Sequence, residues 1–295
     1  MDTHLLRTFT AVVDHGSFSE AARVLGYTQS AVSQHIAALE ADLATPLLTR
    51  RPVAPTEAGA RLLEHARPLL LRLDAARADM ARLGAGPAKT LTVGCTPLAL
   101  TGRLAALLPS GSTVRMVSRA EVAGAVMAGE ADLGFVDGAA APSDPLPVPD
   151  ADALTTAPVA EEPLAVLLPA GHPLATRSAV GLSDLADAHW IDAPDTGIPL
   201  AQLRATARVD GFRPYTVIDG TDVLALGALV AAGHGLTVLP ATVAEALPGT
   251  VAIRIVTPRI AHRTEVLHTR LGEGGPARAL IAALAQPWRV SPRPA

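Results

Sequence analysis

Two short helices joined by a glycine turn are predicted by residues 16–43, GSFSEAARVLGYTQSAVSQHIAALEADL. Ser17 and Glu20 have the S-x-x-E spacing of a capping box, in which each side chain satisfies a free backbone donor at the start of the helix. The apolar residues of this first helix share one face: Phe18, Ala21, Ala22 and Leu25. Gly26 then turns the chain toward the second helix.

The second helix has one apolar and one small polar face. Thr28 is a residue type that caps helix starts, and the apolar stripe consists of Val32, Ile36, Leu39 and Leu43. The opposite face carries Ser30, Ser33, Gln34 and Ala37. Amides and hydroxyls of this kind hydrogen-bond to base edges in the major groove. The pattern predicts a DNA-binding helix-turn-helix. The alternative is a small helical domain in which this helix happens to carry polar residues.

Nearly all of residues 2–62 resembles the N-terminal domain of LysR-type transcriptional regulators, in order and at the family's spacing. The matching positions are Leu6-x-x-Phe9, Gly16-Ser17-Phe18-Ser19-x-Ala21-Ala22-x-x-Leu25, Thr28-Gln29-Ser30-Ala31-Val32-Ser33-x-x-Ile36, Leu39-Glu40-x-x-Leu43, Pro46-Leu47-Leu48-x-Arg50 and Pro55-Thr56-x-Ala58-Gly59. The resemblance implies a winged helix-turn-helix, with the helix-turn-helix at Phe18 to Ala37 and Arg50 in a wing that meets the phosphate backbone.

The resemblance also implies which side chains face DNA. These are Phe18, Ser19, Thr28, Gln29, Ser30, Ser33, Gln34, His35, Arg50 and Arg51. Two features depart from the family's common pattern: Ala44 and Leu48 stand where Gly and Phe are common, and the wing, residues 50–55, is about two residues shorter. The short wing leaves open whether it reaches the minor groove beyond Arg50 and Arg51.

A heptad seam runs along the long helix predicted at residues 56–83. Its members are Leu62, Ala66, Leu69, Leu73, Ala76, Met80 and Leu83. Such a seam buries itself against a partner helix, and in the resembled family this linker helix pairs two subunits; the alternative is packing against the chain's own body. Pro68 lies within the seam and is expected to bend the helix.

A hinge is predicted at residues 84–90, GAGPAKT, because glycine and proline stop a helix. The expected division is a DNA-binding domain at 1–59, a linker and dimerisation helix at 60–83 and an effector-binding domain at 91–295.

Strand-like runs alternate with helical patterns beyond the hinge, which predicts α/β units. The runs lie at 91–95, 113–118, 132–136, 164–168, 236–240, 251–256 and 264–269. Thr96 follows the first run as a predicted helix cap, with Pro97 at the first helical position, and the start of that helix is a natural anion site.

Four segments of this half resemble the effector domain of the same family: Ala128-Gly129-x-x-Asp132-Leu133-Gly134, Gly171-His172-Pro173-Leu174-Ala175, Leu182-x-Asp184-Leu185 and Val230-Ala231-Ala232-Gly233-x-Gly235-Leu236-x-Val238-Leu239-Pro240. The resemblance implies two α/β subdomains that close on a small molecule, as in periplasmic binding proteins. Subdomain I would take 91–157 and 270–295, and subdomain II would take 158–269.

Candidate effector contacts follow from this resemblance. Thr96 and Pro97 occupy the family's usual ligand-contact position, and Thr221 occupies the matching position in subdomain II. Arg119 follows a predicted strand and could bind a carboxylate. Each of the three polar residues has a second interpretation: Thr96 and Thr221 as helix caps, and Arg119 as solvated surface.

Composition limits the other functional classes. The chain of 295 residues carries 24 basic and 28 acidic residues, and this net charge of −4 alone does not favour nucleic acid. The single cysteine, Cys95, fits a reducing, cytoplasmic location and reads as a packing residue, with redox sensing as the alternative. Residues 223–244 lack charge, but their glycines and proline favour a buried α/β unit over a membrane span.

No catalytic motif or metal-ligand spacing occurs, so no enzyme activity, metal or cofactor is expected. The sequence therefore predicts a LysR-type transcription factor that binds double-stranded promoter DNA as a homodimer or homotetramer and responds to a small-molecule effector. The alternative from another class is a solute-binding or enzymatic α/β protein with an accessory helical head.

Overall fold

The computed structural model describes residues 2–84, 90–142, 144–148, 154–208, 211–269 and 275–286. The chain divides into two compact units, Met1–Asp79 and Met80–Ala295, which are considered separately. Residues 85–89, which make up most of the predicted hinge, lie outside the described residues. So do residues 270–274 and 287–295 of the C-terminal segment that was predicted to complete subdomain I.

The first unit is a three-helix core with a two-stranded hairpin and a long helix. Its elements are α1 (Thr3–His15), α2 (Phe18–Leu25), α3 (Gln29–Asp42), β1 (Leu48–Arg50), β2 (Val53–Pro55) and α4 (Glu57–Gly84). The apolar stripes of the helices meet in one core that includes Leu6, Phe9, Val12, Ala21, Val32, Ile36 and Leu39. Leu43, predicted to extend the stripe of α3, instead caps its C-terminus and is 36% exposed.

The helix ends follow local hydrogen-bonding chemistry, with one departure. Thr28 Oγ1 accepts a hydrogen bond from Ala31 N at 3.2 Å, as expected of a cap. Ser17 Oγ likewise accepts from Glu20 N at 3.3 Å. The Glu20 carboxylate, however, accepts from Arg23 Nε at 3.0 Å, because a guanidinium three residues later offers charge-assisted donors. Only half of the predicted capping box therefore forms.

Close backbone contacts attach the hairpin to the helices. Glu40 Oε1 accepts hydrogen bonds from Leu47 N at 2.8 Å and Leu48 N at 3.2 Å. Thr56 Oγ1 accepts from Gly59 N at 3.0 Å at the start of α4. A Cβ atom at Gly59 would lie 2.1 Å from the carbonyl oxygen of Leu47, so only glycine fits this helix start against the strand.

Helix α4 has two different apolar faces. Leu63, Ala66 and Leu70 pack into the core of the first unit, whereas Leu69 and Met80 are 47% and 63% exposed. Of the predicted seam, Leu62 and Ala66 thus pack against the chain's own body. The helix continues through Pro68.

The second unit is built on an eight-stranded sheet with the order β4-β3-β5-β12-β6-β11-β7, with β10 paired to β6, beside a separate pair, β8-β9. The strands are β3 (Thr92–Cys95), β4 (Thr113–Met116), β5 (Leu133–Ala140), β6 (Thr155–Pro169), β7 (Ala179–Gly181), β8 (Trp190–Asp192), β9 (Pro214–Val217), β10 (Thr237–Pro240), β11 (Thr250–Thr257) and β12 (Ala261–His268). The helices are η1 (Pro97–Ala99), α5 (Gly102–Leu107), α6 (Arg119–Met127), η3 (Leu182–Leu185), α7 (Leu200–Ala207), α8 (Val223–Ala231), α9 (Ala241–Ala244) and α10 (Pro276–Leu284).

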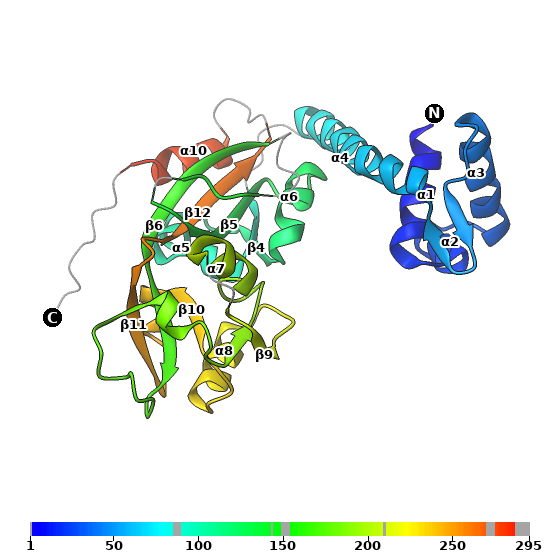
Figure 1. The fold of residues 1–295 in the computed structure, drawn as a ribbon. Helices are drawn as coiled ribbons and strands as arrows, with labels where there is room; N and C mark the ends of the chain where they lie inside the picture. Colours follow the sequence, from blue (N-terminus) through cyan, green and yellow to red (C-terminus); the bar gives the residue numbers. More distant parts are fainter. Residues whose placement is uncertain are drawn as a thin grey trace. The chain divides into compact units, whose positions relative to one another are not determined.

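Strand β6 divides this unit into two halves and joins them. Its residues 155–163 pair with β12, and its residues 164–169 pair with β10 and β11, so the strand runs from one half into the other (Figure 1). One core, with Val93, Phe135 and Val266, lies in the first half together with α10. The second half contains two further cores, around Trp190 and around Leu226.

Strand β12 does not lie where the sequence-based boundary placed it. Residues 158–269 were assigned to subdomain II, yet residues 261–268 pair along their length with β5 and with the first part of β6. The correction has a physical reason: alternation along a strand indicates a buried face but does not identify the partner strand.

Replacing Gly59 with Ala should destabilise the first unit by at least about 2 kcal/mol, because its methyl group would overlap the Leu47 carbonyl and force the backbone apart. Gly124→Ala in α6 is the matched control, since a Cβ there meets nothing within 4 Å and should stabilise by up to about 1 kcal/mol. Scanning calorimetry of both variants measures the effect, and an unchanged transition for Gly59→Ala would contradict the described contact.

Replacing Ala44 with Gly should instead stabilise the first unit, by about 1 kcal/mol. Ala44 has a φ angle of +49°, in the left-handed region where glycine avoids the steric cost of a Cβ. A rise in the midpoint of the first unit's thermal transition would agree with this conformation. A fall would mean that position 44 has a right-handed backbone in solution.

Candidate functional site

The outer face of α3 is the first candidate site. Its buried stripe, Val32, Ile36 and Leu39, fixes the opposite side of the helix toward solvent. The exposed residues at this surface are Ser19, Thr28, Gln29, Ser30 and Gln34, with Ser33 half-buried. They offer hydroxyl and amide groups on a helix that carries no acidic residue in its first turn.

His35 differs from the other residues predicted to face DNA. Its Nδ1 lies 3.1 Å from Thr8 Oγ1 on α1, and its ring makes edge contacts with His4 and Tyr27 at centroid distances of 4.5 and 5.5 Å. The imidazole therefore holds α3 against α1 within the protein. Position 35 is three residues after Val32 and four before Leu39, both buried, and this helical spacing is the signal in the sequence for a role inside the protein.

The hairpin places positive charge beside α2. The Arg50 guanidinium lies 5.3 Å from the centre of the Phe18 ring, a cation–π contact that orients the arginine. Strands β1 and β2 pair in antiparallel register around a two-residue turn, Arg51-Pro52, whose peptide bond is cis. Arg50 and Arg51 are both exposed, so the hairpin presents two cations to solvent, one of them beside α2.

The second candidate site is in the second unit, where the end of β3 lies beside the interior of β5. Thr96 is fully buried, and its hydroxyl donates to the Asp137 carboxylate on β5. Thr96 is the N-cap residue of the single turn η1, as predicted, but its hydroxyl makes no cap hydrogen bond because it donates to Asp137. The interpretation of Thr96 as only a helix cap is therefore wrong, and the short turn does not provide the helix start expected there as an anion site. Pro97 is the first residue of η1 and is half-buried.

Arg119 is part of this site. It begins α6, its backbone N donates to Asp195 Oδ1 at 2.9 Å, and its Nη2 lies 3.5 Å from Asp137 Oδ2. The side chain is 20% exposed, so it is not the solvated surface residue of the alternative interpretation.

Thr221 does not join these residues in any described contact. It is exposed, and Asp222, not Thr221, caps α8 by accepting hydrogen bonds from Leu224 N and Ala225 N. The cap interpretation of Thr221 is therefore also wrong.

Four residues that the sequence did not single out complete the site. Asp137 Oδ2 lies 3.1 Å from His262 Nε2, and His262 Nδ1 lies 3.6 Å from Glu162 Oε1. Glu162 Oε2 accepts a hydrogen bond from Thr242 Oγ1 at 2.6 Å. The side chains of Asp137 and His262 are each only 1% exposed. The result is a buried chain of alternating acidic and basic groups.

Burial and charge act in opposite directions on these groups. Burial alone would raise the pKa of Asp137, but Arg119, His262 and Thr96 outweigh it and hold the pKa below its usual value. The pKa of Glu162 is lowered in the same way by His262 and Thr242. Burial alone would lower the pKa of His262, but the two carboxylates outweigh it and raise that pKa.

The strand register explains the cluster, and also why sequence inspection missed it. His262 pairs directly with Glu162, and Asp137 lies one diagonal position away, opposite Thr264. Side chains at direct and diagonal positions of adjacent strands meet on one face. Asp137 and His262 are 125 residues apart in the chain, and nothing local indicates which strands are neighbours.

Cys95 ends β3 beside this cluster as a fully buried residue. Burial, with the nearby charge of Asp137, raises the pKa of its thiol to about 12. A thiol with such a pKa stays protonated and unreactive at neutral pH. These observations favour the packing role over redox sensing.

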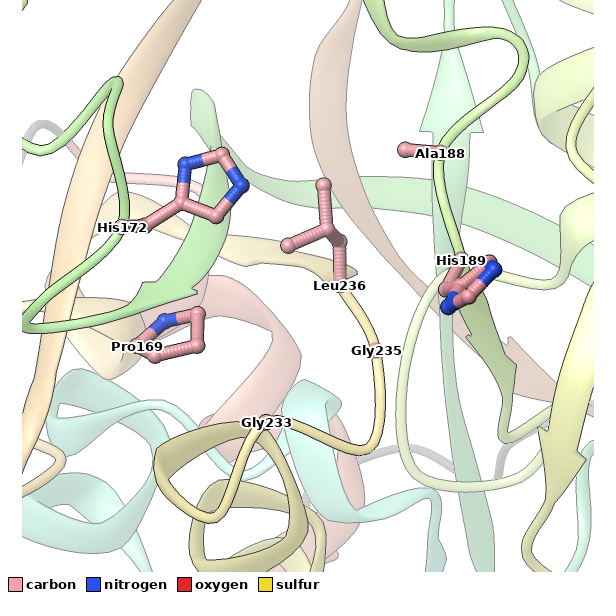
Figure 2. Close-up of a pocket in the computed structure, with 7 residues that line it drawn as sticks. All are labelled: Pro169, His172, Ala188, His189, Gly233, Gly235 and Leu236. Atoms are coloured by element: carbon pink, nitrogen blue, oxygen red, sulfur yellow. The ribbon is translucent and has the colours of Figure 1, made fainter.

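A separate pocket of about 280 Å³ lies in the second half of this unit. Pro169, Ala188 and Leu236 supply apolar lining, and Gly233 and Gly235 supply backbone. Figure 2 shows His172 and His189 on opposite sides of Leu236. The His172 ring is fixed by accepting a hydrogen bond from Leu174 N at 3.2 Å, and His189 stacks on Tyr215 at a centroid distance of 4.3 Å.

The described residues also limit two other classes of site. They include no group of three or more His, Cys, Asp or Glu side chains that could hold a metal ion. None of the helices in that part of the chain has the length and apolar character needed to cross a bilayer. The uncharged run at 223–244 forms α8, β10 and α9, as predicted.

Comparison with known families assigns both units. Residues 3–60 match the family described as "Bacterial regulatory helix-turn-helix protein, lysR family". Residues 84–289 match the LysR substrate binding domain.

Individual relatives agree with this assignment. The small neutral protease regulatory protein of Streptomyces coelicolor is 34% identical over 247 residues, which cover 81% of this chain and 73% of that protein. The Hca operon transcriptional activator HcaR of Escherichia coli is 28% identical over 97% of both chains. These relatives are regulators of transcription, which excludes the enzymatic and solute-binding alternative.

Solved structures give the same answer for the fold. Full-length BenM is 25% identical, with a TM-score of 0.53 over 96% of this chain and 95% of that one. CbnR, a LysR family transcriptional regulator, is 24% identical, with a TM-score of 0.55 over 96% of this chain and 98% of that one. CbnR has also been solved in complex with its target DNA. With both units matched in order along one chain, this protein belongs to the LysR family of transcriptional regulators.

Proposed function

We propose that α3 reads promoter DNA through Gln29, Ser33 and Gln34, while Arg50 and Arg51 hold the phosphate backbone. The observation that carries this proposal is the outer face of α3, which is exposed, small and polar; the exposed Arg50 beside α2 adds a cation in the same unit. Phe18 acts by orienting Arg50, Thr28 and Ser30 offer the helix start to a phosphate, and Ser19 lies beside them. Of the residues predicted to face DNA, His35 contributes only by positioning α3.

Charge in the first unit supports a division of labour among the arginines. Residues 1–65 hold five arginines and seven carboxylates, a net charge of −2. Arg7, Arg23 and Arg61 are in ion pairs with Asp74, Glu20 and Glu57. Arg50 and Arg51 are therefore our candidates for phosphate contacts, and two cations per subunit provide only weak electrostatic attraction to DNA.

We further propose that DNA affinity comes from two or more copies of the chain bound at once. The exposed Leu69 and Met80 on α4 support a helix pair between subunits, because isolated apolar side chains at heptad positions gain by burial. This proposal includes the domain boundaries 1–59, 60–83, 84–90 and 91–295. It also includes assembly as a dimer or a tetramer and a cytoplasmic location.

For the second unit we propose that a small effector binds between the two halves, near Thr96, Pro97 and Arg119. Ligands of sheet-based α/β proteins lie at the carboxyl ends of strands, and Thr96 directly follows the carboxyl end of β3. Thr221, exposed at the start of α8, remains a candidate contact from the second half. A thermal-shift screen of amino acids, aromatic acids and sugar acids would identify the effector, since a ligand at 100 times its Kd stabilises by about 2.7 kcal/mol.

Electrophoretic mobility shift on the DNA upstream of the protein's own gene tests the DNA-reading proposal. Full-length protein should retard that DNA at low salt and lose affinity steeply as salt rises. An absence of retardation at low salt would overturn the proposal.

Two substitutions should separate base reading from phosphate binding. Gln34→Ala should cost about 1–3 kcal/mol on the preferred site and relax base choice, whereas Arg50→Ala should weaken binding to every sequence and reduce the salt dependence. Binding titrations against a set of mutated sites measure both effects. Equal loss on all sites for Gln34→Ala would show that Gln34 does not read bases.

Placing a charge on the exposed face of α4 should disrupt assembly. Leu69→Glu is expected to shift the protein toward monomers in analytical ultracentrifugation and to weaken DNA binding about 100-fold or more, since avidity is lost. Val256→Glu, at an apolar residue of β11 that is also 53% exposed, is the matched control. If Leu69→Glu remains as associated as the wild type, α4 does not pair the subunits.

A further inference from the structure

The cluster of Asp137, His262 and Glu162 lies where the two halves of the second unit join. Glu162 is two residues before Leu164, at which β6 leaves β12 and begins to pair with β10. His262 is the second residue of β12 and faces Glu162 directly in the register. Thr242, which hydrogen-bonds to Glu162, is on α9 in the second half. The cluster therefore connects the sheet of the first half to α9 across the junction.

The geometry around His262, with a carboxylate on each side of the ring, favours its protonated form. Its Nε2 lies 3.1 Å from an oxygen of Asp137, and its Nδ1 lies 3.6 Å from an oxygen of Glu162. A neutral imidazole has one N–H, so its other nitrogen would turn a lone pair toward a carboxylate. Only the protonated ring interacts favourably with both sides. The imidazole is 1% exposed, so water does not take over either role.

The two carboxylates differ in what they retain when the ring loses its charge. Asp137 keeps the Thr96 hydroxyl from the end of β3 and the Arg119 guanidinium from α6, which lies 3.5 Å away. Glu162 is 19% exposed and has Thr242 as its other described partner. Loss of the proton therefore weakens the Glu162 side first, which is the side that reaches the second half.

We propose that His262 is a proton-dependent clasp between the two halves of the effector unit. With His262 protonated, Glu162 and α9 are held in the described arrangement. When His262 loses its proton, Glu162 and Thr242 are released, and the halves move more freely. The inference rests on the proposed function in one respect, namely that the effector controls movement between the halves. Because His262 controls the same movement, the response to the effector then depends on pH.

The pH range follows from the directions of the pKa shifts. His262 has a folded pKa above its ordinary value of 6.5, so its stabilising contribution is complete below about pH 6.5 and is lost as the pH rises through that folded pKa. The carboxylates have lowered pKa values, so their contributions are present above about pH 4 and are lost on acidification. The clasp is therefore closed in mildly acidic solution and opens toward alkaline pH.

Hydrogen–deuterium exchange of the full-length protein from pH 6 to 9, corrected for intrinsic exchange rates, tests the clasp. Protection of β6 and of residues 237–244 should fall once His262 titrates, by up to about tenfold per pH unit, because the opening is coupled to one proton. His262→Gln should abolish this added pH dependence. Thr242→Val should lower the protection of residues 237–244 near pH 6, where the clasp is closed, and match the wild type once His262 has lost its proton, while leaving the contact of His262 with Asp137.

His189→Gln is the matched control, since His189 is exposed, stacks on Tyr215 and lies outside the cluster; it should behave as the wild type. Equal pH dependence in the wild type and His262→Gln would overturn the clasp, as would wild-type protection in Thr242→Val near pH 6. If His262→Gln does not fold, the wild-type titration and Thr242→Val still decide. None of these readouts uses DNA or an effector, so their failure leaves the proposed DNA reading intact.

Discussion

The continuity of strand β6 is the constraint on which the second unit depends. One strand supplies backbone hydrogen bonds to β12 in the first half and to β10 and β11 in the second, so the part of the sheet in either half is incomplete without it. Any change in the relation of the two halves must bend this strand and the short link between β11 and β12. Charged groups where β6 passes between the halves can therefore influence that movement. Glu162 and His262 lie at this point and pair directly in the strand register.

In the first unit the main constraint is electrostatic, because its net negative charge opposes contact with DNA. Five of its arginines are in described ion pairs with carboxylates of the same unit, and Arg50 is directed by the Phe18 ring. The surface of α3 adds hydrogen-bonding groups without adding charge. Such a unit depends on precise placement of few contacts and on several copies acting together.

Local rules were sufficient to predict much of this structure. The helices of the first unit follow from apolar periodicity and from caps such as Thr28 and Gly16, whose chemistry involves neighbours within a few residues. The strands β3, β4, β5, β10, β11 and β12 and the second part of β6 follow from apolar runs between turns. Residues 155–163 of β6 and the short strands β7, β8 and β9 gave no such prediction, and the pairing of β12 with β5 depends on long-range register.

The candidate effector site was less predictable for the same reason. Thr96 looked like a cap because its neighbours in sequence suggested one, but its partner is 41 residues away on β5. Asp137, Glu162 and His262 occur in segments with no recognisable motif, and only the register brings them together. His35 was misjudged on a smaller scale, since its partner Thr8 is on another helix.

The measurement that tests the account most directly is DNA affinity with and without a small molecule that thermally stabilises the second unit. The account predicts that this molecule changes the Kd for the upstream DNA by about 5- to 150-fold, the range of typical coupling between two sites. A molecule that binds the second unit but leaves the Kd and the footprint unchanged would contradict the account.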